Sequence, residues 1–174
     1  IIFPQLRNFK IFSKLNSYTN KMLPKLDFIF LISLLIIDET DNTDYFLYKF
    51  NISKKDQKRV KNIQEFYKNK IFPKAFDEKN LNKILYYKGK EAVIDILNFR
   101  IFKSNKYENN LIDLIDIYKN KSAPMMPVKA EIIMKKFKMS EGKVLGDKLK
   151  IIEDEWVRNN FQISDKQVEN IIND

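Results

Sequence analysis

The sequence predicts an all-α protein, and three observations support this. Apolar residues recur every three or four positions along most of the chain, which is the period of an amphipathic helix. The alternation of apolar and polar residues that marks a half-buried strand is hard to find. Hydrophobic residues make up 44% of the 174 positions and aromatic residues 13%, which is enough for a packed core. We expect a multi-helix body over residues 1–123, followed by a smaller helical tail over residues 124–174.

The body is expected to begin with two helices of different character. Residues 5–19 place several large apolar side chains on one stripe, which predicts an amphipathic helix. Residues 26–37 are apolar nearly all round, so we expect that helix to lie at the centre of the body. A polar run over 38–44 then leads into a short helix over 44–50.

The remainder of the body reads as four more helices. Ser53 and Asp56, three residues later, predict the capped start of a basic helix that continues to about Tyr67. Pro73 is expected to end this part of the body. Three further helices are expected over 77–87, 90–103 and 107–119.

A proline-rich segment, 122–127, separates the tail from the body. The tail is expected to contain a short helix over 128–137 and a long helix over 142–160. Ser164 and Gln167 have the spacing of a capping box, which predicts one last helix.

The composition excludes several kinds of chemistry. The chain has no cysteine and no histidine, which removes disulfides, thiolate chemistry, the commonest general base and the commonest metal ligand. The absence of cysteine fits a reducing, cytoplasmic setting. The most apolar stretch, 28–37, is half as long as the roughly twenty residues that a bilayer needs, so we expect no membrane insertion. The sequence begins in mid-pattern with no leader, and we expect it to be part of a longer polypeptide without a signal peptide.

Acidic residues gather in three places, and none of the patterns predicts a metal site. Asp113 and Asp116 share one face of a predicted helix, which is typical of a solvated face. The acids of the 38–44 run lack the spacing and the glycine of an EF-hand, so helix capping and turn formation explain them better than a cation does. Glu153, Asp154 and Glu155 lie near Arg158 on the predicted long helix, which is typical of surface ion pairs.

The net charge is +9 and the isoelectric point is about 9.5, values typical of a nucleic-acid-binding protein. The charge alone does not decide, because lysine is abundant throughout, together with isoleucine and asparagine. The distribution of basic residues along the chain is more informative than the net charge. Over 54–70 seven basic residues stand against two acids, and over 135–150 six stand against two. Both runs fall on predicted helices, where an RNA-binding surface and an ordinary solvated face give the same pattern.

Two local features are candidates for direct contact with RNA. Two of the three glycines, Gly142 and Gly146, open the predicted long helix, where bare backbone admits close approach and unpaired N–H groups attract a phosphate. The segment 138–142 joins two helices in the layout of a helix-hairpin-helix element, and a packing unit without a ligand explains it equally. Tyr86-Tyr87, beside Lys88 and Lys90, is the aromatic and basic cluster best suited to stacking on bases.

The order of these features resembles the C-terminal half of the bacterial CCA-adding tRNA nucleotidyltransferases and the related poly(A) polymerases. Upstream, LISLLIID at 31–38, FNISKKDQKRV at 50–60 and YYKGKEAVIDILNFRIF at 86–102 resemble segments of that family in the same order. In the tail, ten residues fall in step with the family pattern: Pro127, Val128, Ile133, Gly142, Gly146, Leu149, Glu153, Trp156, Val157 and Phe161.

The tail also departs from the family pattern. Lys138 and Ala130 stand where the family has glycine, and Glu141 stands where it has proline. Glu141 places a negative charge at the loop that would meet a phosphate. Lys138 and Lys143 offset that charge.

The resemblance implies an RNA-binding module and not a complete enzyme. The family's catalytic head holds two Mg²⁺ ions through a D-x-D pair, and its neck motif selects CTP or ATP; neither stretch occurs in this sequence. We therefore expect this chain alone to hold no cofactor and to catalyse no nucleotide addition. Mg²⁺ and ATP or CTP belong to the head. Whether the parent enzyme adds CCA, only A, only CC or poly(A) depends on that head.

The resemblance further implies that the chain holds tRNA by its acceptor and T arms, while a head and neck domain, in the same or a separate chain, extends the 3′ end. Recognition is expected to follow backbone shape, because A-form arms hide their base edges. The expected contacts are Lys135, Lys136, Lys138, Gly142, Lys143 and Lys148, then Lys54, Lys55, Lys58 and Arg59. The alternative is a partner-binding subunit of a split enzyme, or a non-catalytic remnant, whose apolar start at 1–4 packs on a head or neck domain.

Overall fold

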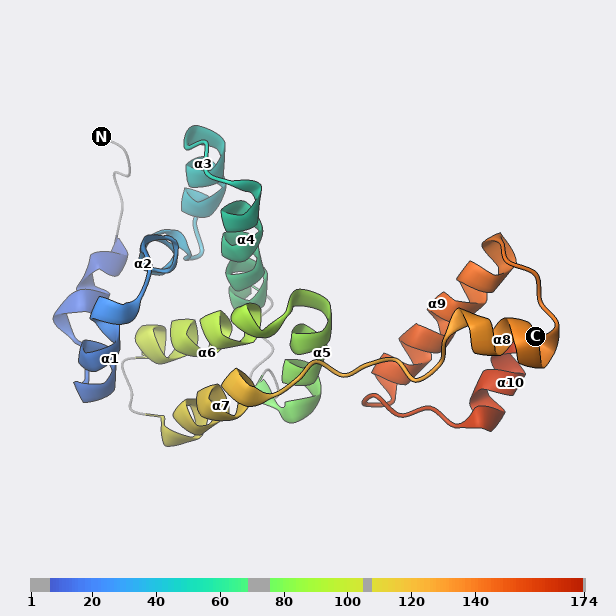
Figure 1. The fold of residues 1–174 in the computed structure, drawn as a ribbon. Coiled ribbons are helices and arrows are strands. Elements are labelled where there is room, and N and C mark those ends of the chain that lie inside the picture. The colour runs from blue at the N-terminus through green and yellow to red at the C-terminus, as the bar shows by residue number, and fades with distance from the viewer. Residues whose placement is uncertain (1–6, 69–75, 105–107, 174) are drawn as a thin grey trace. The chain divides into compact units, whose positions relative to one another are not determined.

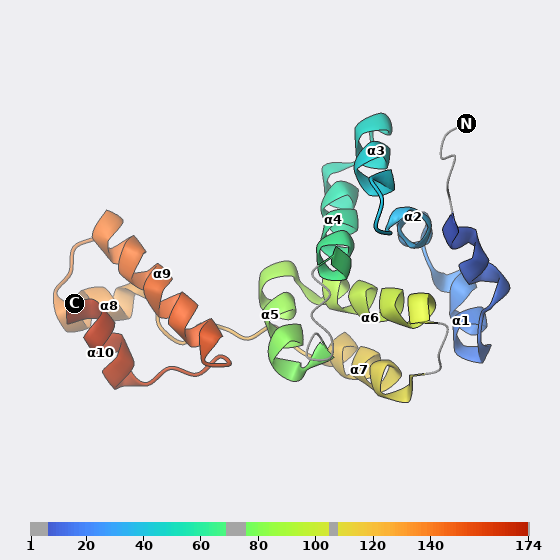
Figure 2. The same ribbon diagram turned by 180° about the vertical axis from the view of Figure 1, so that it is seen from behind.

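The computed structural model describes residues 7–68, 76–104 and 108–173. Over these residues the chain forms ten α-helices and two short 3-10 helices, with no strand, which confirms the all-α prediction. Expectations for residues 1–6, for Pro73 and for residue 107 lie outside the described ranges. The chain divides into two compact units, Ile1–Ala123 and Pro124–Asp174 (Figure 1; Figure 2 gives the view from behind). No described helix is both long and apolar enough to cross a membrane.

The single helix expected over residues 5–19 is wrong. The described part forms a 3-10 helix, η1 (Arg7–Ser13), and then, after a break, the helix α1 (Ser17–Met22). Asn16 explains the break, because its side-chain oxygen accepts the Thr19 N–H at 2.9 Å and so starts a new helix. Asparagine competes with the helical hydrogen-bond ladder in this way and favours a cap over a helix interior.

The short 3-10 helix η2 (Leu23–Lys25) was not predicted. The other helices of the first unit start within two residues of the predicted positions. In chain order they are α2 (Phe28–Ile36), α3 (Asn42–Lys49), α4 (Lys54–Lys68), α5 (Glu78–Lys88), α6 (Lys90–Ser104) and α7 (Asn109–Asn120). The predicted cap of α4 is confirmed, because the Ser53 hydroxyl accepts the Asp56 N–H at 3.1 Å. Asp27 caps α2 in the same manner, accepting the Phe30 N–H at 3.0 Å.

Helix α6, and not α2, lies at the centre of the first unit. Its residues Phe99 and Phe102 belong to a core shared with α2 and α4, whereas Leu97 and Ile101 belong to a second core shared with α5 and α7. In Figure 1, α6 accordingly lies between α4 and α7. The prediction that the 26–37 helix lies at the centre is therefore wrong. Helix α6 is apolar on two opposite faces, whereas Phe28 at the start of α2 is exposed.

Lys103 ties α6 to the end of α2 through a half-buried amine. Its Nζ donates to the Ile37 carbonyl at 2.9 Å, where the C-terminal end of a helix attracts a cation. The rings of Phe99 and Tyr67 lie beneath it, with centroids at 5.3 and 5.8 Å. Burial lowers the pKa of Lys103 to about 8, although the nearby charge of Asp38 opposes the change.

The second unit is a small three-helix assembly of α8 (Ala130–Phe137), α9 (Lys143–Arg158) and α10 (Asp165–Asn173). Its fully buried centre consists of Ile133, Leu145, Ile152 and Val168. The predicted capping box before α10 is confirmed: Gln167 N–H donates to the Ser164 hydroxyl at 3.3 Å, and Ser164 N–H donates to the Gln167 side chain at 2.9 Å.

The C-terminal end of α9 explains two residues of the family pattern. Phe161 N–H donates to the Trp156 carbonyl at 2.8 Å, and Asn160 N–H donates to the Val157 carbonyl at 3.3 Å. This is a Schellman ending, and the rings of Trp156 and Phe161 make its hydrophobic contact at 4.9 Å between centroids. Trp156 and Phe161 therefore have a packing role in this chain.

Candidate RNA-binding surfaces

The loop between α8 and α9 presents unpaired backbone groups. Helix α8 ends at Lys138, which adopts the left-handed conformation with φ 51° and ψ 34°. Gly142 precedes α9 with φ 155° and ψ −171°, a region that essentially only glycine occupies, and no side chain caps the helix start. The first N–H groups of α9 are therefore open to an anion. The likeness of this loop to a helix-hairpin-helix phosphate site stays a prediction.

Gly146 lies in the first turn of α9 without an internal packing reason. It is exposed, and a Cβ built on it meets no atom within 4 Å among the described residues. A glycine in a helix interior costs about 1 kcal/mol relative to alanine. The loss of helix stability at Gly146 therefore occurs where the backbone is exposed to solvent.

The lysines expected around this loop separate into two groups. Lys135, Lys138 and Lys143 are exposed and make no ion pair or hydrogen bond with any described residue. Lys136 instead pairs with Glu169 at 2.8 Å, and Lys148 donates to the Ile171 carbonyl at 2.8 Å. Both of these lysines therefore contact α10.

The net charge is divided unequally between the two units. Residues 124–174 contain nine basic and nine acidic residues, so the second unit has no net charge. Residues 1–123 contain 23 basic and 14 acidic residues and carry the whole excess of +9. The long-range electrostatic field of the chain on a polyanion would therefore come from the first unit, whereas the second unit has only local groups of charge.

Several basic residues of α4 are exposed along the helix. Lys54, Lys55 and Lys58 are exposed and have no partner among the described residues, as the prediction requires. Lys61 shares these properties and was not among the expected contacts. Its position could have been found from spacing, because Lys54, Lys58 and Lys61 follow each other at four and three residues on one helix face.

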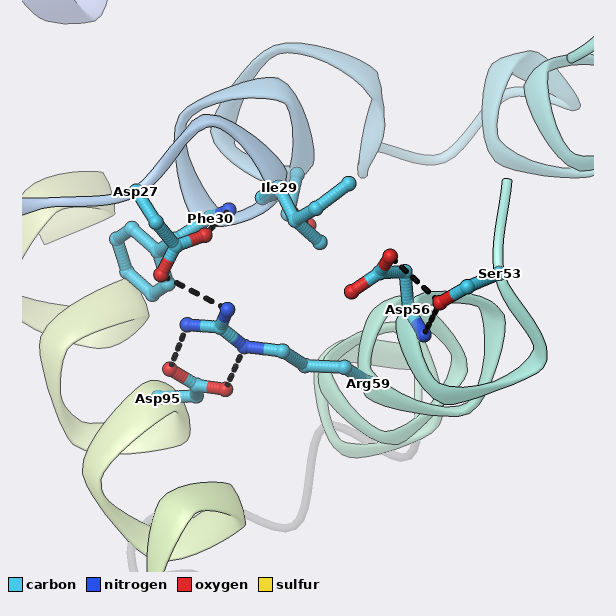
Figure 3. A network of polar contacts seen from close by, with 8 residues as sticks. Asp27, Ile29, Phe30, Ser53, Asp56, Arg59 and Asp95 are labelled. Carbon is cyan, nitrogen blue, oxygen red and sulfur yellow. Dashed lines mark hydrogen bonds and ion pairs between the residues drawn. The ribbon is translucent and has the colours of Figure 1, made fainter.

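Arg59 lies on the same helix but points into the unit (Figure 3). Its Nε and a terminal nitrogen donate to the two carboxylate oxygens of Asp95 at 2.6 and 2.9 Å. The other terminal nitrogen lies 2.8 Å from Asp27 Oδ2. Asp95 is on α6 and Asp27 caps α2, so the guanidinium joins three helices. The expectation that Arg59 contacts RNA is corrected, because its charge is already matched.

The three charged groups of this network change each other's pKa values. Burial raises the pKa of Asp95, and the hydrogen bonds and charge of Arg59 oppose that rise. Partial burial also acts to raise the pKa of Asp27, but the Phe30 N–H and Arg59 outweigh it and lower that pKa. The hydrogen bonds that Arg59 donates to Asp95 raise the pKa of Arg59, which therefore stays protonated.

A cavity of about 370 Å³ lies beside this network. Its charged lining comprises four cations and four carboxylates: Lys55, Arg59, Lys90, Lys119, Asp27, Asp56, Glu91 and Asp95. Because these charges balance, the cavity has no electrostatic preference for a phosphate. Across the described residues, no cluster of acidic side chains is arranged to hold a metal ion. In the 38–44 run, Asp38 instead accepts hydrogen bonds from Thr40 and Asn42 and shapes the turn before α3.

Comparison with protein-family models, with curated proteins and with solved structures gives no match for this chain. The resemblance to the tRNA nucleotidyltransferases therefore depends on the ordered motifs alone. In the structure, five apolar members of the tail pattern lie in or against buried parts of the second unit: Val128, Ile133, Leu149, Trp156 and Val157. Pro127 is exposed. The described residues provide no packing role for Gly142 or Gly146.

Proposed function

We propose that this chain binds structured RNA, with tRNA as the expected substrate, and presents its 3′ end to a catalytic head in the same or a separate polypeptide. The observation that carries the proposal is the α8–α9 loop, where Lys135, Lys138 and Lys143 are exposed and unpaired beside an uncapped helix start. Lysine charge and backbone N–H groups are the usual means of holding a phosphate.

The proposed contacts recognise backbone shape and not base sequence. Lysine donates to phosphate as a point charge, and A-form helices keep their base edges in a deep groove that side chains do not reach. The α4 lysines add the long-range attraction, because the first unit carries the excess charge. The two surfaces are proposed to share one RNA, as the resemblance to tRNA nucleotidyltransferases implies.

Charge reversal at the loop tests this proposal. The variant K138E/K143E is expected to bind tRNA severalfold more weakly, and its salt dependence is expected to decrease by about one unit in log–log slope for each phosphate that the loop no longer neutralises. The variant K129E/K166E is the matched control, because it changes the net charge equally at exposed positions of the second unit outside the loop. Circular dichroism checks that both variants are folded. Equal weakening by the two variants would contradict a site at the loop.

A further inference from the structure

Helix α3 carries an exposed aromatic ring that the fold does not use. Tyr48 is 86% exposed, the highest value among the large apolar side chains that the structure describes in the first unit. Thr43 and Phe46, on the opposite face of α3, are buried and hold the helix against the core. Tyr48 makes no hydrogen bond or ring contact with any described residue. Its ring is therefore held out to solvent by a helix that is fixed on its other side.

The ring lies at the basic end of a helical hairpin. Asp44, near the start of α3, lies 3.8 Å from Lys68 at the end of α4, so the two helices run antiparallel (Figure 1). The end of α3, with Tyr48 and Lys49, therefore lies beside the start of α4. We call this end the α3–α4 corner, which consists of Tyr48, Lys49, Lys54, Lys55 and Lys58. Its four lysines have no partner among the described residues.

We infer that the α3–α4 corner binds an unpaired, single-stranded segment of RNA, with a base stacked on Tyr48; this inference rests on the proposed RNA binding. An exposed ring at the same end of the hairpin as four unpaired lysines matches the two halves of a nucleotide, since the base offers a π-face and the phosphate a negative charge. A duplex has its base faces covered, so the ring selects unpaired nucleotides. The other aromatic cluster is less suitable, because Lys88 pairs with Glu65 at 2.6 Å and Lys90 donates to the Lys119 carbonyl.

The test compares two RNAs and three proteins. The RNAs are a blunt hairpin and the same hairpin with a short single-stranded 3′ extension that contains 2-aminopurine. The proteins are the unchanged chain, Tyr48→Ala and Tyr48→Phe, and because Tyr48 is exposed neither variant is expected to disturb the fold. The extension is expected to tighten binding to the unchanged protein. The affinity for the extended RNA is expected to decrease about tenfold in Tyr48→Ala and only slightly in Tyr48→Phe, which keeps the ring. Stacking is expected to quench the 2-aminopurine fluorescence.

The outcomes separate this inference from the proposed function. If the blunt hairpin binds but Tyr48→Ala leaves the extended RNA unaffected, the inference is wrong and the proposed function stands. If neither RNA binds the unchanged protein, both are wrong. If an acidic peptide of equal charge displaces the extension and its binding also depends on Tyr48, the corner is a protein-binding surface and the inference is overturned.

Discussion

Replacing Arg59 by methionine tests the network that joins α2, α4 and α6. The variant keeps the length and the apolar part of the side chain but removes its charge. Asp95, whose side chain is 8% exposed, then has no counter-ion. Removing one member of a buried ion pair typically costs about 3–5 kcal/mol. Asp27 adds little, because its carboxylate is half exposed and reaches water.

Protonation sets an upper limit on this loss. An unpaired Asp95 folds in its neutral form, and the free energy needed to protonate it is about 1.4 kcal/mol for each pH unit above its ordinary pKa of about 4. The penalty for an unpaired charge at pH 7 is therefore at most about 4 kcal/mol, and we expect a total loss of about 3 kcal/mol because Arg59 itself is partly exposed. At pH 5 this penalty decreases to at most about 1.4 kcal/mol. The difference in free energy of unfolding between the variant and the unchanged protein is therefore expected to be smaller at pH 5 than at pH 7.

Urea unfolding followed by far-ultraviolet circular dichroism measures this loss. The single tryptophan, Trp156, lies in the second unit, so its fluorescence follows that unit separately and helps to assign the loss to the first unit. The double variant R59M/D95L removes both charges and is expected to recover most of the stability, since apolar residues of similar volume replace buried ion pairs at little cost. A loss below about 1 kcal/mol in Arg59→Met at pH 7 would refute a desolvated, paired Asp95.

Three further predictions concern Gly146, Lys103 and Tyr118. Gly146→Ala is expected to stabilise the second unit by about 1 kcal/mol in thermal or urea unfolding, because a Cβ there meets no protein atom. The same variant is expected to bind tRNA more weakly, because the Cβ covers bare backbone. Tighter tRNA binding together with higher stability would exclude Gly146 from the contact surface. The free energy of unfolding is expected to rise by about 2 kcal/mol between pH 8 and 10, because burial lowers the pKa of Lys103 to about 8 and its charged form is penalised only in the folded state. Above pH 10 stability is expected to fall again, because burial, with the charges of Glu78 and Asp77, raises the pKa of Tyr118 to about 12; Lys103→Met should remove the rise and leave the fall.

Local sequence patterns predict most of the helices and several of their ends. The caps at Ser53 and Ser164 depend on residues three positions apart, so the sequence contains all the information that forms them. The same kind of local effect explains the error at the N-terminal helix. Asn16 lies among residues whose apolar spacing predicts one continuous helix. That spacing does not show that the Asn16 side chain caps and starts a new helix.

Contacts between distant segments could not be predicted in the same way. Arg59 and Asp95 are 36 positions apart, and Lys136 and Glu169 are 33 apart, so a basic run in the sequence does not show which of its members are already paired. The central place of α6 was missed for a related reason. A helix buried on two faces shows little amphipathicity, and its position depends on which helices cover it.

The affinity of this chain for intact tRNA, measured at moderate salt against an excess of unstructured RNA of equal length, tests the central claim most directly. If the chain reads the shape of the tRNA backbone, tRNA binding persists in the presence of the competitor. If the competitor abolishes binding, the charge of +9 attracts any RNA, and shape recognition by this chain is contradicted.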